Sequence, residues 1–351
     1  MKKSFLFLAV CAAALTACTS EEVIEEGVQS NAIGFQNLIS KESRALTTGE
    51  GGTFNKFYVY GYYTQDDALN NPVSVFDGEE VTLKDGVWSY DNTRYWVPAA
   101  TYRFYAFSCE NARPTTPDVG LNLEGGSKEQ RALKIVGYTT HNHHDLVFAT
   151  NDDGIKGKNK GEGNEKVALT FKHILSKIKV EFDSEFAPGY DIEVSKVSIQ
   201  NVYDKADYSP YSTPTWGNVT RTSTDEINPT KIDLALIADK NISSAADPNV
   251  EGSEELKAAT VDGYVIPHEY STSLVKLVFT IDVKQGNDVM FSRTLTGSWS
   301  PKWEEGKAYK YNVKINGSAA ELEPIVFETS QDIDGWEAGN TSEVNMSFSA
   351  N

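Results

Sequence analysis

Apolar and polar residues alternate along many short runs of this chain. The runs KAYKYNVKI (307–315), KIKVEF (177–182) and KLVFTIDV (276–283) each place apolar side chains on one face and mostly polar side chains on the other. A period of two is typical of half-buried strands in an antiparallel sheet. Asp85-Gly86 stands between two apolar runs and predicts a two-residue hairpin. Because helical periodicity is scarce, the pattern predicts an all-β fold built from antiparallel β-sandwiches.

Aromatic residues occupy both faces of one predicted strand, FYVYGYY (57–63). Such a strand either has apolar cover on both sides or exposes a row of tyrosines, and we expect cover on both sides. Four tryptophans are expected to fill the sandwich cores: Trp88, Trp96, Trp299 and Trp303. The alternative is that exposed aromatic rings stack on sugars.

A stretch rich in glycine and lysine, DDGIKGKNKGEGNEK (152–166), interrupts the chain near its middle. Its composition is that of a long loop that cannot build a core. The apolar segment 167–182 follows, and its alternation slips near His173, which suggests a bulge or a bend. A chain of 351 residues is long enough for two domains, which we expect at 45–165 and 166–351.

The first residues, MKKSFLFLAVCAAALTAC, have the arrangement of an export signal, with two lysines, a short apolar stretch and small residues before a cysteine. LTAC at 15–18 is similar to a lipobox, in which the cysteine is acylated after the preceding residues, here 1–17, are removed. We therefore expect Cys18 to anchor the precursor to a membrane, because several acyl chains hold a protein stably. An ordinary signal peptide with an incidental cysteine is the alternative. No later segment is long and apolar enough to cross a bilayer.

The chain is strongly acidic. Its net charge of −18 becomes −20 when Lys2 and Lys3 leave with the signal, and such a surface repels phosphate backbones, so no nucleic acid partner is expected. The stretch TSEEVIEE (19–26) resembles an acidic tag of exported surface lipoproteins, with a plain solvated tether as the alternative. Only Cys109 would keep its thiol in the mature chain, so we expect no disulfide and a buried Cys109.

Candidate catalytic and metal chemistry is sparse. HNHH (141–144) could offer two imidazoles on one strand face, but no further histidine or cysteine lies near in sequence to complete a zinc or copper site. HEYST (268–272) lacks the second histidine of a zinc-protease helix. DIDGWEAGNTSE (332–343) has glutamate where a calcium loop needs glycine, although a looser calcium site stays open. No nucleophile-elbow or phosphate-loop motif occurs. We expect no enzyme, no cofactor and no metal.

Several segments, taken in order, resemble one family. They are the lipobox at Cys18, IGF (33–35), SRA (43–45), FYVYGYY, the run 75–108, HDLVFAT (144–150), VALTFKHILSKIKVEF (167–182), WEEGKAYKYNVKI (303–315) and PIVFETSQDIDGW (324–336). Together they are similar to the fimbrillins, the lipoprotein precursors of Bacteroidetes type V pili. The resemblance extends over nearly the whole chain.

This resemblance implies two tandem transthyretin-like β-sandwich domains, preceded by a tether and a removable strand within residues 18–44. An arginine-specific protease would cut between Arg44 and Ala45 and release the strand 31–39 together with the lipid anchor. A donor strand from the C-terminal region of another pilin subunit would then fill the vacated groove. The alternative for Arg44 is an ordinary exposed arginine in a linker.

The residues of the two segments agree with those roles. The first strand has three apolar residues on one face, which are Ile33, Phe35 and Ile39. The last segment, SEVNMSFSAN, has three that alternate with polar neighbours, which are Val344, Met346 and Phe348. Such alternation suits a donor strand, because main-chain bonds give affinity and alternate side chains give register. PIVF (324–327) is the rival donor.

We therefore expect a structural pilin precursor that reaches the cell outer membrane as a lipoprotein and then enters an extracellular fimbrium. One alternative is a tip or anchor adhesin that binds a host or bacterial surface ligand. Another is a monomeric surface lipoprotein that binds glycans. The deciding observation is the place of the first strand, which lies either in a slot of the first sandwich or loose in solvent.

Overall fold

The computed structural model describes residues 31–39, 47–48, 52–65, 70–109, 118–140, 144–159, 166–184, 190–210, 215–225, 229–236, 241–243, 259–271, 274–315, 326–330, 337–338 and 348–350. Strands make up nearly all of the regular structure in these ranges. Their single helix is α1 (Lys128–Arg131), where the Ser127 side chain accepts a hydrogen bond from the Gln130 amide. Among the described residues, no helix has the length and hydropathy needed to cross a bilayer.

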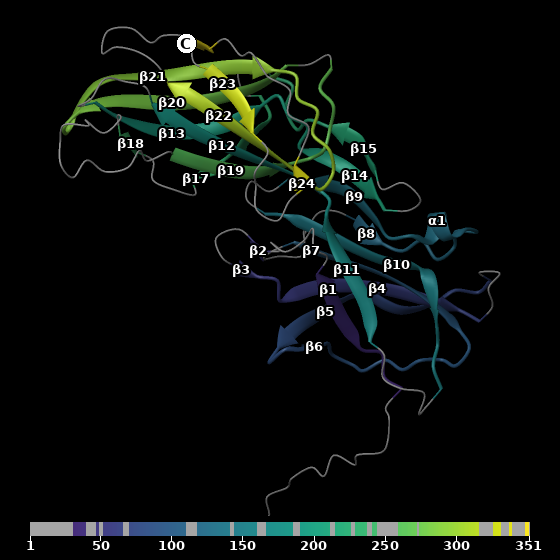
Figure 1. The fold of residues 1–351 in the computed structure, drawn as a ribbon. Coiled ribbons are helices and arrows are strands. Elements are labelled where there is room, and N and C mark those ends of the chain that lie inside the picture. Colours follow the sequence, from purple (N-terminus) through teal and green to yellow (C-terminus); the bar gives the residue numbers. More distant parts are fainter. Residues whose placement is uncertain are drawn as a thin grey trace, which may run out of the picture.

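The N-terminal body contains a seven-stranded sheet and a four-stranded sheet (Figure 1). The first has the order β1 (Phe35–Ile39), β11 (Val167–His173), β10 (Leu146–Lys156), β7 (Thr101–Cys109), β4 (Lys56–Thr64), β5 (Val73–Lys84) and β6 (Val87–Ser89). The second has the order β15 (Thr215–Thr220), β14 (Lys205–Ser209), β9 (Lys134–Thr139) and β8 (Asp118–Gly120). A short ribbon pairs β2 (Thr47–Thr48) with β3 (Gly52–Thr53).

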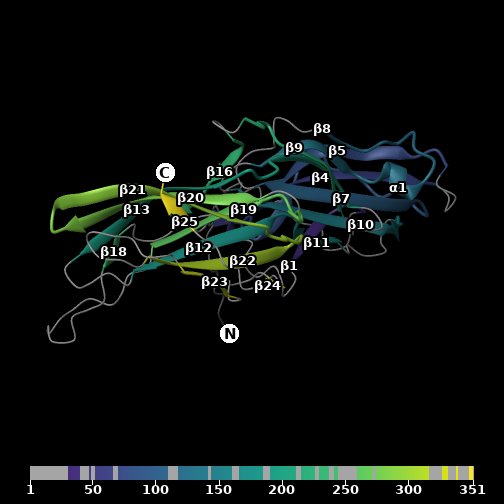
Figure 2. The ribbon, with the colours of Figure 1, turned by 90° about the horizontal axis from the view of Figure 1, so that it is seen from above.

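The C-terminal body contains two six-stranded sheets, and the two bodies lie end to end in an elongated molecule (Figure 2). One sheet has the order β17 (Ala235–Leu236), β19 (Ala259–Val265), β12 (Ser176–Ser184), β22 (Lys307–Ile315) and β23 (Val326–Ser330), with β24 (Glu337–Ala338) also on β22. The other has the order β16 (Lys231–Asp233), β13 (Asp191–Gln200), β20 (Val275–Gln285), β21 (Asp288–Trp299) and β25 (Phe348–Ala350), with β18 (Asn241–Ser243) also on β13.

Three apolar cores hold these sheets together. The seven-stranded sheet curls around the first core, because its end strands β1 and β6 contact each other. The second core lies between the outer face of that sheet and the four-stranded sheet. The third lies between the two sheets of the C-terminal body. The predicted all-β sandwich architecture is therefore confirmed.

Strand β4 separates two of these cores, as its aromatic pattern predicted. Phe57 and Val59 face the first core, whereas Tyr58, Tyr60 and Tyr62 face the second. The expected core tryptophans are also confirmed. Trp96, Trp299 and Trp303 are buried, and Trp88 packs half-buried against the first core.

Several local predictions are confirmed. The stretch 152–166, expected to be a long loop, is in part a strand, because β10 extends to Lys156, and two further features differ from expectation. Asp85 and Gly86 form the β5–β6 turn with positive φ angles of 50° and 78°, and Cys109 is buried. The chain bends after β11, at Ile174 and Leu175, close to the predicted position. The sheets are mixed rather than purely antiparallel, because β1–β11, β12–β22 and β22–β24 are parallel pairs.

The second difference concerns the division of the chain. The boundary expected near 166 stays a prediction, but β11 joins the N-terminal sheet and would move it beyond His173. In addition, β14 and β15 from the later half pair with β9 of the earlier half. The N-terminal body is therefore built from residues on both sides of the expected boundary.

Candidate functional site: a slot closed by the first strand

The first described segment, residues 31–39, fills a slot in the N-terminal body. One wall of this slot is β11. Strand β1 runs parallel to it from Phe35 opposite Val167 to Ile39 opposite Phe171. The ladder begins one residue earlier, where the Val167 amide donates to the Gly34 carbonyl at 2.7 Å. The segment thus lies in the sheet rather than loose in solvent.

The other wall of the slot is the segment 90–96 between β6 and β7. Ala32 forms an antiparallel bridge with Tyr95. The Ile33 amide donates to the Arg94 carbonyl at 2.8 Å, and the Trp96 amide donates to the Asn31 carbonyl at 2.9 Å. Segment 31–39 therefore has backbone partners on both sides, which is how the slot holds its occupant.

The floor of the slot is aromatic. The Phe35 ring is 1% exposed and packs edge-on against four rings. These are Phe57, Phe76, Tyr90 and Phe104, at centroid distances of 6.0, 5.4, 5.8 and 5.9 Å. Edge-to-face packing is a favoured geometry, because the positive edge of one ring meets the negative face of another. Phe35 is therefore an anchor residue within the first core.

Polar contacts at the slot fix the position of segment 31–39. The Tyr90 hydroxyl donates to the Ile33 carbonyl at 2.7 Å, and burial raises the pKa of this phenol, so it stays a donor at neutral pH. Arg94 holds the same wall, since its Nε donates to the Val75 carbonyl at 3.3 Å and its guanidinium lies 3.6 Å from Glu79. Ile33 is 1% exposed and belongs to the same core.

The predicted processing and donor residues are placed only in part. Cys18, Arg44, Ala45, Val344 and Met346 lie outside the described residues. For the other two, the structure describes the backbone: Ile39 is the last residue of β1, and Phe348 is the first residue of β25. The cleavage site and the lipid site therefore stay predictions.

Two C-terminal strands occupy sheet edges of their own C-terminal body. β23 pairs with β22, with Phe327 opposite Val313. β25 pairs with β21, with Phe348 opposite Gly297. The described parts of both rival donor segments, β23 and β25, are thus edge strands, which can leave a sheet without separating two other strands.

Metal-binding and sugar-binding sites were the other possibilities raised by the sequence. Of HNHH, only His144 is among the described residues, and these contain no group of three or more ligands that could hold a metal ion. A buried His173 contacts Asp145 at the end of β11. His268 and Glu269 lie in a non-helical segment, so they do not form a zinc-protease helix.

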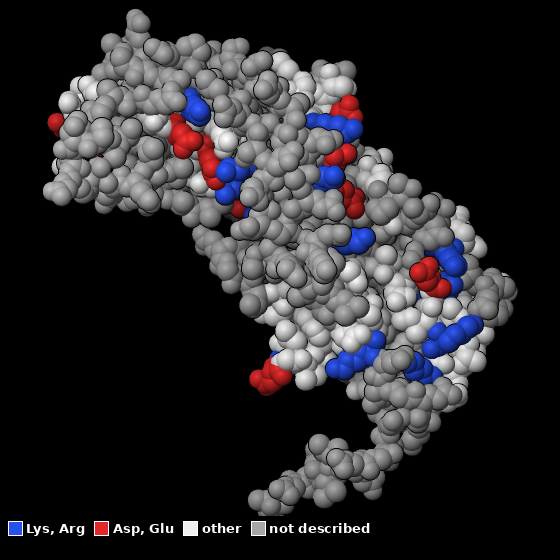
Figure 3. All heavy atoms as spheres, viewed as in Figure 1, with Lys and Arg blue, Asp and Glu red and all other residues white. Residues whose placement is uncertain are grey.

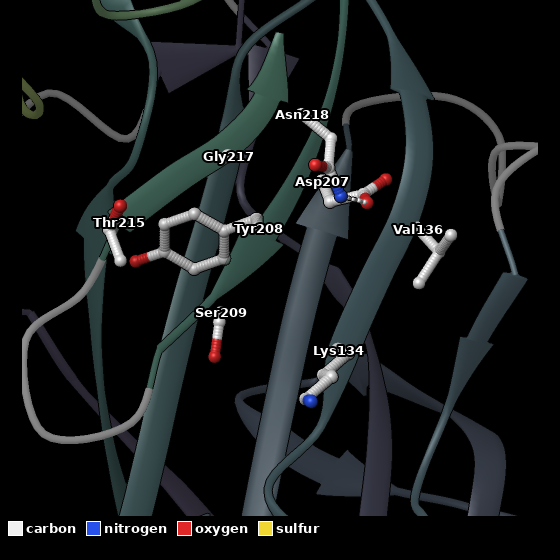
Figure 4. A pocket seen from close by; sticks show the side chains of 8 residues that line it. All are labelled: Lys134, Val136, Asp207, Tyr208, Ser209, Thr215, Gly217 and Asn218. Atoms are coloured by element: carbon white, nitrogen blue, oxygen red, sulfur yellow. Dashed lines mark hydrogen bonds between the residues drawn. The ribbon is translucent and has the colours of Figure 1, made fainter.

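A hollow of about 240 Å³ lies on the four-stranded sheet (Figure 4). Asp207 is oriented there by the Gly137 amide and by the Asn218 amide group, each at 2.6 Å. The Tyr208 ring is 2% exposed, and its hydroxyl donates to Glu305 at 3.0 Å. Among the described residues that line it, the hollow therefore has no exposed aromatic face on which a sugar ring could stack.

Charged side chains of the C-terminal body are largely paired where they are described. Figure 3 shows acidic and basic groups side by side on this body. Glu181 lies 2.7 Å from Lys310 and 3.0 Å from Lys179. Burial opposes ionisation of Glu181, but hydrogen bonds from these two lysines lower its pKa. These pairs neutralise each other and do not form a binding site for one sign of charge.

Comparisons with known proteins agree with this architecture. A family model described as fimbrillin-like matches residues 43–348, which is most of the chain. The chain belongs to the fimbrillin-like family. It is thus a structural, non-enzymatic protein of the cell surface, of the kind that forms fimbriae or mediates adhesion. A search of curated protein sequences gave no match.

Several solved structures that are similar to this chain come from species of Bacteroides. A fimbrial protein from Bacteroides vulgatus has a TM-score of 0.52 and 18% identity, covering 88% of this chain and 99% of that one. A protein assigned to cell adhesion from Bacteroides uniformis has a TM-score of 0.45 and 17% identity, covering 86% and 99%. The first likeness supports the fold alone.

Proposed function

We propose that this fimbrillin-like chain is a pilin precursor that polymerises by strand exchange. Cleavage after Arg44 would release segment 31–39 from its slot, and a strand from the C-terminal region of another subunit would replace it. The observation that carries the proposal is the burial of Ile33 and Phe35 between two walls that both bond the segment's backbone.

The free energy of an empty slot supports replacement. Burying Ile33 and Phe35 contributes about 1.5–3 kcal/mol each from apolar transfer alone. Without segment 31–39, β11 would present unpaired backbone groups along residues 167–171, and four aromatic rings would lose their cover. An exposed edge of this kind is a template for another strand. A matching segment from a second subunit would satisfy the same groups.

The route to the surface forms part of the same proposal. Acylation of Cys18 would anchor the precursor at the outer membrane, and the acidic residues 19–26 would form the tether between lipid and fold. Cleavage after Arg44 would detach the tether and segment 31–39 together. A single processing step would thus couple release from the membrane to opening of the slot.

The test is limited proteolysis of the purified precursor with an arginine-specific protease. We expect a cut between Arg44 and Ala45, followed by oligomer ladders that resist mild denaturant. Arg44→Lys is the matched control, because it keeps the charge but removes the cleavage site. A cut chain that stays monomeric and keeps segment 31–39 in place would contradict the proposal.

A further inference from the structure

The Ile-x-Phe pattern of the slot occupant recurs once in the chain. Among all 351 residues it occurs as Ile33-Gly34-Phe35 and as Ile325-Val326-Phe327. The second copy of the pattern leads into β23, an edge strand of the C-terminal body. In Figure 1, β23 and β1 lie in different bodies of the molecule.

We propose that Ile325-Val326-Phe327 of a second copy of this chain is the strand that fills the slot. This assignment rests on the strand-exchange function proposed above, and it selects this segment over the one that contains Val344, Met346 and Phe348. The incoming strand would run in the same direction as β1, parallel to β11. Ile325 would take the place of Ile33, and Phe327 would take the place of Phe35.

The aromatic floor explains why the side chains match. The Phe35 site is bounded by four rings within 6.0 Å, so it accepts a flat phenyl group. The Ile33 site is two residues away on the same face, and a β-branched side chain suits an extended strand better than methionine does. Ile325 and Phe327 reproduce both the isoleucine and the phenylalanine of the slot occupant, whereas Met346 and Phe348 reproduce only the phenylalanine.

The backbone bonds of the slot also fit this segment. On the side of residues 90–96, the bonds use the Asn31 carbonyl and the Ile33 amide. Glu323 and Ile325 would supply the same two groups. Pro324 would fall between them in the place of Ala32. On the other side, the Val326 carbonyl would accept from the Val167 amide as the Gly34 carbonyl does now.

Two contacts change in this fit. The Asn31 side-chain amide donates to the Trp96 carbonyl at 3.2 Å, and Glu323 in its place would not donate this bond. A Cβ atom at position 34 would lie 3.3 Å from Cγ of Lys166, so Val326 would need this lysine to shift by a few tenths of an ångström. Lys166 is exposed, and its side chain can rotate into solvent. The same closeness provides a test, because a cysteine at 166 would lie beside the residue that occupies position 34.

The first experiment uses cysteine pairs in the full chain after cleavage at Arg44. Lys166→Cys with Val326→Cys is expected to give disulfide-linked oligomers, and each single variant controls for pairing with a native cysteine. Lys166→Cys with Ser347→Cys is the matched comparison, since Ser347 would occupy position 34 if Phe348 filled the Phe35 site. A disulfide between positions 166 and 347 would overturn the assignment. Oligomers in which neither cysteine pair forms a disulfide would also overturn it.

The second experiment avoids any effect of a variant on folding of the C-terminal body. A synthetic peptide of residues 321–331 is added to the cleaved chain, and its binding is measured by fluorescence anisotropy. We expect it to bind more tightly than a peptide of residues 342–351, and to lose about 100-fold in affinity when Phe327 is replaced by alanine. Tighter binding of 342–351 would overturn the assignment and leave strand exchange standing. If neither peptide binds and the wild-type chain forms no oligomers, strand exchange itself fails.

Discussion

Replacing Phe35 by alanine tests whether segment 31–39 is part of the first core. The ring is buried among four others, and its removal leaves a cavity in a floor that is fixed by β4, β5 and β7. Truncation of a buried phenylalanine costs about 3–5 kcal/mol, which includes the lost ring contacts. A domain has only about 5–15 kcal/mol of stability, so the variant should lose a large part of it.

Urea unfolding gives the measurement, with tryptophan fluorescence as the signal, because Trp88 and Trp96 report on the same core. We expect Phe35→Ala to lower the free energy of unfolding of the N-terminal body by about 4 kcal/mol. The matched control is Tyr95→Ala in the slot wall, where the ring is 58% exposed and the change should stay within about 0.5 kcal/mol. A loss below about 1 kcal/mol for Phe35→Ala would show that the core closes without this segment.

Two further predictions concern the junction of the bodies and one turn. Burial raises the pKa of Glu305 to about 7, against the lowering effects of the Tyr208 hydrogen bond and of Lys172. The folded chain then binds more protons than the unfolded chain between about pH 4.5 and pH 7. The free energy of unfolding should therefore fall as pH rises through this range, by at most about 3 kcal/mol. Glu305→Gln should flatten this dependence in urea titrations, and Tyr208→Phe should shift it to higher pH; an unchanged slope in Glu305→Gln would refute the assignment. Gly86→Ala should cost about 1–2 kcal/mol, because φ is +78° there, whereas Gly217→Ala meets open space and should change thermal stability little; equal effects would contradict the turn geometry.

Local alternation was enough to predict most strands and the faces that they bury. In β12, Ile178, Val180 and Phe182 all point into the third core, as the period of two requires. The burial of Ile33 and Phe35 likewise follows from their spacing. These predictions succeed because the two-residue period is set by strand geometry and not by which strand lies alongside.

Pairing between distant segments could not be predicted in the same way. Nothing in the alternation of Phe35–Ile39 indicates that its neighbour is Val167–His173, or that the pair is parallel. The same holds for β14, which joins β9 of the N-terminal body although it follows β12 and β13 of the C-terminal body in sequence. Register and partner depend on contacts across the fold, and many partners would satisfy one alternating strand. The wall formed by residues 90–96 was missed for this reason.

The position of β1 explains how a buried strand can also be removable. It is an end strand of its sheet, so its departure breaks its own bonds to β11 and to residues 90–96, while β11 keeps two pairs with β10, Val147–His173 and Phe148–Lys172. The departure nevertheless uncovers aromatic rings and a row of backbone groups, which is unfavourable in water. Removal therefore leaves a high free energy in the empty slot, and replacement by another strand lowers that free energy without rebuilding the core.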